Sequence, residues 1–301
     1  MFMTPVLARA VRIVAEIHHS HGVKGAVSVA DLRRRFPEWS DEFWHRALER
    51  AKWFDEPTVE SSVIAPPLAM TPRRAQVLLA RGVVPASYVA LRAWAEACGT
   101  EAVINHHLDQ ACADPEYLGH RLSVLLAFQE AWPLYRDGPD ATLFFDRLTE
   151  FLVACHFSVV AEPRPMPATT WHDALAAALR HPGFFGHHLI CLSWVARSRS
   201  LLEAQQVANA LAWVVDASRS VYADDEDNVV ITPVEPALLT QEALDHALRA
   251  LLTRGVRNIH LLTLASAIAW LWADAADESR AYLLAIAQRF TEADAANAAG
   301  T

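Results

Sequence analysis

The sequence predicts an all-α protein. Ala, Leu, Arg, Glu and Gln dominate long segments in which apolar residues recur three or four positions apart, the spacing of an amphipathic helix. Proline and glycine clusters interrupt these segments at residues 137–139, 162–167 and 181–183, as is typical of turns between helices. The second half of the chain shows no sustained alternation of apolar and polar residues, so no sheet is expected there.

The N-terminal region predicts three helices, over residues 6–20, 28–36 and 40–54. The second and third begin at Ser28 and Ser40, whose hydroxyl groups suit the N-cap position. A short β-branched stretch at residues 59–64 reads as a strand, and Thr71-Pro72 then begins another helix. Three helices followed by an extended hairpin resemble a winged helix, so we expect residues 1–82 to form a small winged-helix-like subdomain.

The remainder, residues 83–301, predicts a multi-helix domain. Its clearest helices cover residues 171–179, 201–218 and 241–252, and residues 228–232 are a short strand candidate. Residues 1–82 carry 12 Lys and Arg against 9 Asp and Glu, whereas residues 83–301 carry 14 against 26. This change from a net charge of +3 to −12 supports two units of different character.

Composition excludes several classes of protein. With 53% hydrophobic and 20% charged residues, the chain is globular. The longest apolar run, Leu261–Ala273, is shorter than the roughly 20 residues that span a bilayer, and Arg9 interrupts any N-terminal signal sequence, so we expect a cytoplasmic protein without a membrane partner. The acidic balance, and Asp41 and Glu42 at the start of the expected recognition helix, disfavour nucleic acid as a partner.

Histidine is the most unusual feature of the composition. The chain has 14 histidines but only two lysines, Lys24 and Lys52. Three similar segments place a histidine just inside a predicted helix with apolar residues after it, at His106, His187 and His260. Three helices could each direct one imidazole inward, to hold a transition metal or to act as a general base. Ordinary buried histidines bonded to backbone carbonyls are the alternative.

The same segments carry a family resemblance. Asn105-His106, Phe185-Gly-His187-His-Leu-Ile190 and His260-Leu-Leu-Thr263, with Trp171 and Trp213 between them, are similar to motifs of the questin oxidase-like proteins over residues from about 102 to about 290. The resemblance implies flavin-independent, oxygen-dependent oxidation of a polycyclic aromatic, such as a Baeyer–Villiger-type cleavage of an anthraquinone in natural-product biosynthesis. It also implies a histidine-rich iron site, with His106, His187 and His260 as ligands and catalytic residues.

One position departs from the family pattern. Four residues after His187, where family members often have a second histidine, this chain has Cys191. Either Cys191 supplies a thiolate, or His188 or another histidine completes the site, or the site is degraded. Both lysines lie outside the similar region and are not expected as ligands. Four aromatic residues are expected to line a pocket for a flat substrate, or else to belong to the core: Phe185, Trp194, Trp270 and Trp171.

Two other patterns compete for the site. Glu16 and His19, and likewise Glu42 and His45, have the Glu-x-x-His spacing of di-iron helix bundles. The neighbouring His18, His19 and His21 fall where the first helix is expected to end, which favours a solvated helix terminus.

The leading hypothesis is therefore a metal-dependent, flavin-independent oxygenase that acts on an aromatic, polyketide-like intermediate. Iron is the expected cofactor, with other transition metals left open. The alternative is a non-catalytic binding protein whose winged-helix-like unit recognises a peptide or DNA. In either case residues 1–82 could dock a peptide or protein partner, and the sequence leaves a homodimer open.

Overall fold

The computed structural model describes residues 3–16, 21–51, 70–115, 118–155, 168–221, 228–254 and 259–298. Within these ranges the chain forms fourteen α-helices and no strand, which confirms the all-α prediction. Short 3-10 turns occur at η2 (Phe184–Gly186) and η4 (Pro236–Leu238).

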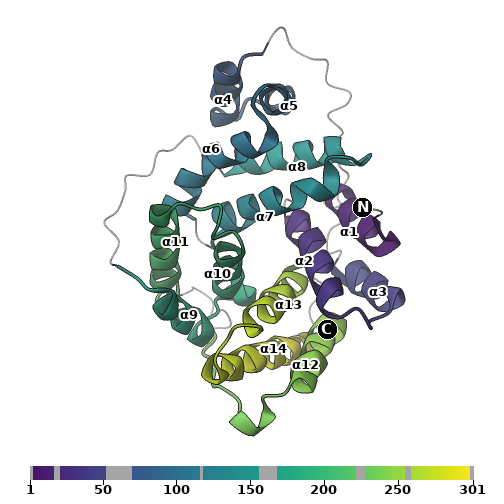
Figure 1. The fold of residues 1–301 in the computed structure, drawn as a ribbon, viewed down its shortest axis with the longest axis vertical. Helices are drawn as coiled ribbons and strands as arrows, with labels where there is room; N and C mark the ends of the chain where they lie inside the picture. The colour runs from purple at the N-terminus through teal and green to yellow at the C-terminus, as the bar shows by residue number, and fades with distance from the viewer. Residues whose placement is uncertain are drawn as a thin grey trace.

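Four helices form the centre of the fold: α2 (His21–Arg35), α7 (His120–Tyr135), α10 (His187–Arg197) and α13 (Ile259–Trp272). Each packs against two of the others in the closed order α2, α7, α10, α13 (Figure 1). Helices α7 and α13 carry apolar residues all around, as buried helices do. The first nine residues of α2 are buried as well, Lys24 included.

The four central helices run in the same direction. Their N-terminal residues lie together, and side chains further along them meet again in an ion-pair network described below. Neighbouring helices that run parallel cannot be joined by short turns, because each one ends at the far end of the bundle. The chain therefore returns through outer helices before each new central helix.

The outer helices supply these return paths and cover the bundle (Figure 1). Helices α3–α6 connect α2 to α7, helices α8 and α9 connect α7 to α10, and helices α11 and α12 connect α10 to α13. The outer helices are α1 (Pro5–Glu16), α3 (Asp41–Ala51), α4 (Pro72–Ala80), α5 (Ala86–Cys98), α6 (Thr100–Ala113), α8 (Ala141–Ala154), α9 (Trp171–Arg180), α11 (Ala204–Ala217), α12 (Gln241–Arg254) and α14 (Asp277–Ala298).

Most predicted helices are present, with different ends. The expected helix from Ser28 begins instead at His21, because Gly22 and Gly25, which suggest a break in the sequence, are buried within α2. Residues 228–232 form no strand. Ile231 N donates to Arg180 O, so this extended segment is held by helix α9 rather than by a sheet.

The winged-helix-like unit stays a prediction. Its three helices correspond to α1, α2 and α3, but the expected strand at residues 59–64 lies outside the described residues. Helix α2 packs against α7 and α13, so this part of residues 1–82 belongs to the same core as the second half of the chain. The proposed boundary at residue 82 stays a prediction too.

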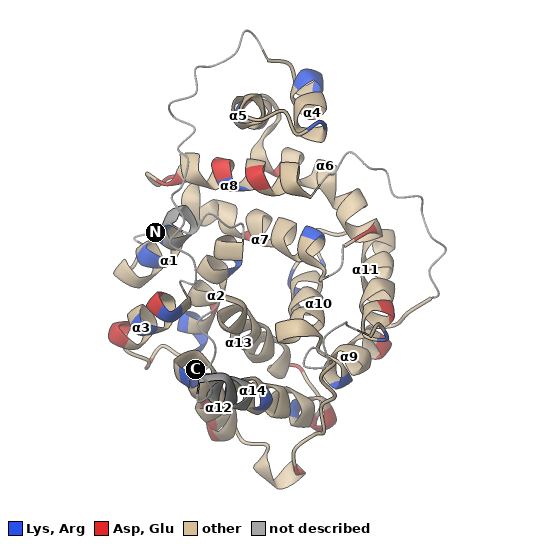
Figure 2. Cartoon of the chain, turned by 180° about the vertical axis from the view of Figure 1, so that it is seen from behind, with Lys and Arg blue, Asp and Glu red and all other residues tan. Residues whose placement is uncertain are grey.

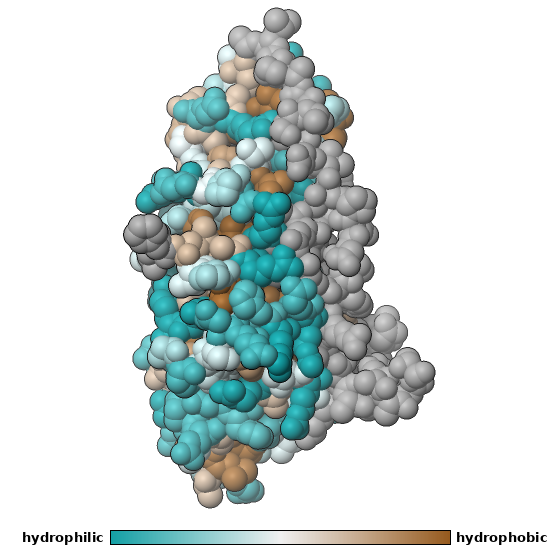
Figure 3. All heavy atoms as spheres, turned by 90° about the vertical axis from the view of Figure 1, so that its right-hand side faces the viewer, coloured by the Kyte–Doolittle hydropathy of each residue, from teal (hydrophilic) through white to brown (hydrophobic). Residues whose placement is uncertain are grey.

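The surface is polar over the faces in view. Outer helices such as α3, α9, α11 and α12 carry charged residues (Figure 2), and the side of the molecule shown in Figure 3 is largely hydrophilic where its residues are described. In the part of the chain that the structure describes, no helix combines the length and the apolar composition needed to cross a membrane.

Candidate metal centre

Four histidines meet where the four central helices begin. His21, His120 and His187 are the first residues of α2, α7 and α10, and His260 is the second residue of α13. One ring nitrogen from each lies within 4.8 Å of those of the other three. We call this group the four-histidine cluster.

The rings of the cluster are in direct contact. Nε2 of His120 lies 2.8 Å from Nε2 of His187, and the ring centroids of these two residues are 4.7 Å apart. His21 lies 4.3 Å from His120 and 4.9 Å from His260, again between ring centroids. His21 and His187 are buried, whereas His120 and His260 are partly exposed. His120 and His260 are therefore the two less buried residues of the cluster, although Nε2 of His260 is itself buried.

Glycines bring the helices close enough for this contact. A Cβ atom on Gly25 would lie 2.5 Å from Cδ1 of Ile259, so a side chain there would have to displace the end of the Ile259 side chain where α2 meets α13. Gly186 has a φ of 76°, and a Cβ atom there would lie 2.5 Å from Cδ1 of Leu264. Only glycine adopts that backbone conformation without strain. These glycines place His21 and His187 against α13.

His187 is oriented by its backbone. Its Nδ1 bonds the carbonyl oxygen of Phe184, which leaves Nε2 directed at the cluster. A hydrogen bond of this kind fixes the tautomer of a metal-binding imidazole. Burial, and then the charge of Lys24, lower the pKa of His187 to about 3, so its ring is neutral at pH 7, the form that binds metal.

The donor set fits a transition metal. Ligand bonds of about 2.1 Å place two nitrogens on opposite sides of an ion about 4.2 Å apart, close to the spread of the cluster. Neutral imidazoles suit iron, zinc, copper and nickel. Iron is therefore compatible with these residues, although four imidazoles do not select it over the other metals. The cluster contains no carboxylate among the described residues.

Lys24 lies one helical turn after His21 on the same side of α2. It is fully buried, and its Nζ has no hydrogen-bond partner in the described part of the chain. Desolvation lowers the pKa of Lys24 to about 7, opposed only by Cys191. No carboxylate in the described part of the chain forms an ion pair with the Lys24 amine.

An ion-pair network joins the same four helices further along. Arg197 of α10 bonds Asp31 of α2 at 2.8 Å and both carboxylate oxygens of Glu130 of α7. Ser266 of α13 donates to Asp31 at 3.2 Å. Asp31, Glu130 and Arg197 each follow their helix's clustered histidine by ten residues, or about 15 Å along a helix. The network thus fixes the register of the helices that carry the cluster.

The structure brings together two of the three histidines that the sequence singles out. His187 and His260 are in the cluster, whereas His106 is exposed on α6, where its ring lies 5.1 Å from Trp94. Its neighbour His107 faces inward and bonds Val103 O at 2.8 Å. His106 is therefore not among the histidines whose ring nitrogens meet in the cluster.

His21 and His120 are not among the metal ligands predicted from the sequence. A signal for both is present, because each has a glycine beside it, Gly22 and Gly119, as His187 has Gly186. The position of His21 also shows that the expected solvated helix terminus is instead a buried helix start.

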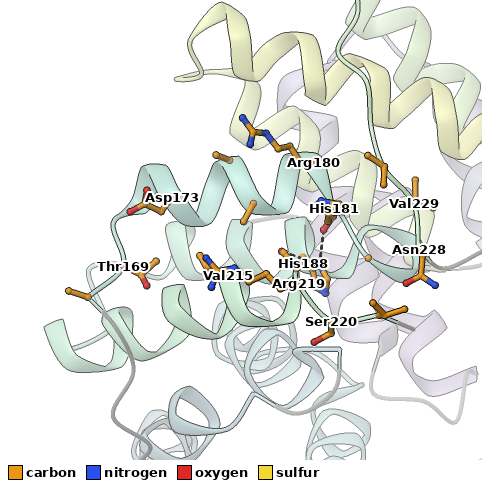
Figure 4. A pocket seen from close by; sticks show the side chains of 17 residues that line it. Thr169, Asp173, Arg180, His181, His188, Val215, Arg219, Ser220, Asn228 and Val229 are labelled. Carbon is orange, nitrogen blue, oxygen red and sulfur yellow. Dashed lines mark hydrogen bonds between the residues drawn. The ribbon is translucent and has the colours of Figure 1, made fainter. Parts of the chain in front are cut away.

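His188 and Cys191, the other expected ligands, lie outside the cluster. His188 Nδ1 is 2.7 Å from His181 O and 3.3 Å from Ser218 Oγ, and the residue lines a cavity of about 840 Å³ between α9 and α11 (Figure 4). Arg180 and Arg219 also line this cavity. Burial raises the pKa of the Cys191 thiol to about 12, which disfavours a thiolate ligand. Another histidine pair, His21 and His120, takes the place that these residues were expected to fill.

Of the four aromatic residues expected to bind substrate, Phe185 alone contacts the cluster. Its ring stacks on His260 at 5.7 Å with an interplanar angle of 9°, and it is partly exposed. Trp194 is buried under Arg197, Trp270 lines a small cavity beside Asp31, and Trp171 packs on the core at the start of α9.

The Glu-x-x-His pairs form no second centre in the described residues. Glu42 bonds Arg46 on the exposed side of α3, away from the cluster. His19 lies outside the described residues, so the pair that it forms with Glu16 has no structural account.

Comparisons of the chain with protein-family models, with curated proteins and with solved structures found no match. The geometry of the cluster therefore carries the functional argument.

Proposed function

We propose that this protein is a metal-dependent, flavin-independent oxygenase of the questin oxidase-like type, with its metal at the four-histidine cluster. The observation that carries the proposal is the convergence of His21, His120, His187 and His260 from four separate helices. Several imidazole nitrogens that converge on one point match the donor set that transition metals prefer.

The metal, when bound, would supply the activation of dioxygen that neutral imidazoles cannot provide. His21, His120, His187 and His260 would hold this metal through their ring nitrogens. The chain's own residues would hold the metal and orient the substrate. Phe184 fixes His187, and Phe185, which is partly exposed and stacks on His260, would offer an aromatic face to a flat substrate.

The proposed reaction can be balanced in atoms, protons and electrons. Insertion of one oxygen atom beside a ring ketone breaks one carbon–carbon bond and forms two carbon–oxygen bonds, one to the carbonyl carbon and one to the carbon that migrates, giving a lactone. The second oxygen atom of O2 leaves as water, which requires two protons and two electrons. An external two-electron reductant, such as a reduced nicotinamide, must supply these electrons.

Elemental analysis tests the metal centre. We expect about one transition-metal ion per chain in the wild type and a large loss in His187→Ala and His120→Ala. His106→Ala is the matched control, because it removes an exposed histidine outside the cluster and should retain full metal. Absence of metal from the wild type, or equal loss in the control, would refute the proposal.

Oxygen uptake tests the reaction. A hydroxyanthraquinone and a reduced nicotinamide should cause uptake with the metal-loaded wild type and not with His187→Ala. The binding-protein alternative has less support, because α2, which belongs to its expected recognition unit, is packed between α7 and α13. Metal binding without uptake on any aromatic would favour that alternative.

A further inference from the structure

The four-histidine cluster lies at the starts of four helices and near Lys24. Its four ligands are neutral imidazoles, so a divalent ion bound there would keep its full charge. The clustered histidines begin four helices, and each helix start carries about half a positive charge from the aligned peptide dipoles. Within the described residues, no carboxylate joins the cluster.

Lys24 adds a further donor on the same side. A helical side chain points back toward the N-terminus of its helix, so Lys24 extends toward the turn that carries His21. The Lys24 charge acts on His187 across the bundle. Its Nζ is fully buried and without a hydrogen-bond partner in the described chain. A buried amine without a partner costs stability unless a ligand supplies an acceptor.

Resting on the proposed function, we propose that the four-histidine cluster binds its metal together with an anionic oxygen ligand of the phenolate class, and that Lys24 donates a hydrogen bond to this ligand. The anion compensates the charge of the ion and of the four helix starts. The aromatic class follows from Phe184 and Phe185, two partly exposed rings 4.3 Å apart, the second of which stacks on His260. The substrate would thus be bound as an ionised hydroxyaromatic.

Azide is the probe for the anion position. The full-length protein is loaded with Cu²⁺, and azide is titrated while its charge-transfer absorption is followed. We expect Lys24→Met to retain one copper per chain and to bind azide at least about tenfold more weakly, because a hydrogen bond to a charged group is lost. Lys24→Arg keeps a donor and should lie between the two.

Cys191→Ala is the matched control. Cys191 also interacts electrostatically with Lys24, is equally buried and lies outside the cluster. Its replacement should leave both copper content and azide affinity unchanged. Two related compounds test the class of substrate. Ionised 4-nitrophenol should displace azide, whereas its neutral methyl ether, 4-nitroanisole, should not.

The outcomes separate the two proposals. A wild-type chain that binds no metal overturns the proposed function and this inference with it. Full copper loading with unchanged azide affinity in Lys24→Met overturns the role of Lys24 alone. Displacement of azide by 4-nitroanisole as effectively as by 4-nitrophenol overturns the phenolate ligand.

Discussion

Replacing Lys24 with methionine should stabilise the metal-free protein, and by an amount that depends on pH. Lys24 is fully buried, its Nζ has no partner in the described chain, and its pKa is lowered from 10.5 to about 7. Methionine has a similar length and needs neither a proton nor a hydrogen bond. The substitution therefore removes the cost of desolvating an amine and keeps the packing of α2.

The sign and size follow from proton linkage. Between about pH 7 and pH 10.5 the unfolded chain holds a proton on Lys24 that the folded chain has released. The free energy of unfolding then rises with pH, by about 1.4 kcal/mol per unit. Below about pH 7 Lys24 is protonated in both the folded and the unfolded chain, so the folded chain bears the full cost of burying a charged amine. From about pH 6 to about pH 10 the wild type should gain about 4 kcal/mol relative to Lys24→Met.

Urea denaturation followed by circular dichroism measures this difference, after chelation so that metal binding adds nothing to stability. Other titrating groups are common to both proteins and cancel in the comparison. Lys24→Met should be the more stable protein at about pH 6, and its advantage should shrink toward about pH 10. His106→Ala, an exposed control, should follow the wild type at every pH. A constant difference between wild type and Lys24→Met would show that Lys24 is not desolvated.

Three further substitutions test the construction of the bundle. Arg197→Met should cost about 3 kcal/mol in urea denaturation, because it leaves the carboxylates of Asp31 and Glu130 without their partner; a loss below about 1 kcal/mol would contradict this. Gly186→Ala combines positive φ with a close contact to Leu264, so we expect about 2–4 kcal/mol of destabilisation together with reduced metal content, and wild-type metal content would count against the role of this glycine. Thr170→Ala removes a helix cap and should cost about 1 kcal/mol without changing metal content, as measured by denaturation and elemental analysis.

The helical class could be predicted from the sequence because local signals agree with it. The helix at residues 171–179 is an example, since Thr170 caps it and Asp173 returns the hydrogen bond, a local pattern. The start of α2 could not be predicted in this way. Gly22 and Gly25 suggest a break, but Gly25 is needed where α13 packs on α2, and a contact between residues so distant in sequence leaves no local signal.

Two of the four clustered histidines could be predicted from the sequence, again because their local context is informative. His187 and His260 stand before apolar runs that form central helices, so the context was informative. His106 has the same context, but the buried side of α6 runs through Val103, Ile104, His107 and Leu108. Their helical spacing places His107, not His106, inward, and the sequence contains that information. His120 could be recognised only by comparing two helices. Ten residues separate His120 from Glu130, and the same interval separates His187 from Arg197.

The parallel arrangement of the four helices explains why one end of the bundle needs a ligand and the other does not. At the far end, Arg197 is paired with Asp31 and Glu130, so opposite charges meet within the chain. At the near end, four helix starts and Lys24 gather around the histidines, and the described residues place no carboxylate among them. A divalent ion alone would add to this positive charge. An anion from outside the chain would balance it, so metal and anion should bind more tightly together than separately. Azide should therefore raise copper affinity in the wild type, and this gain should be smaller in Lys24→Met.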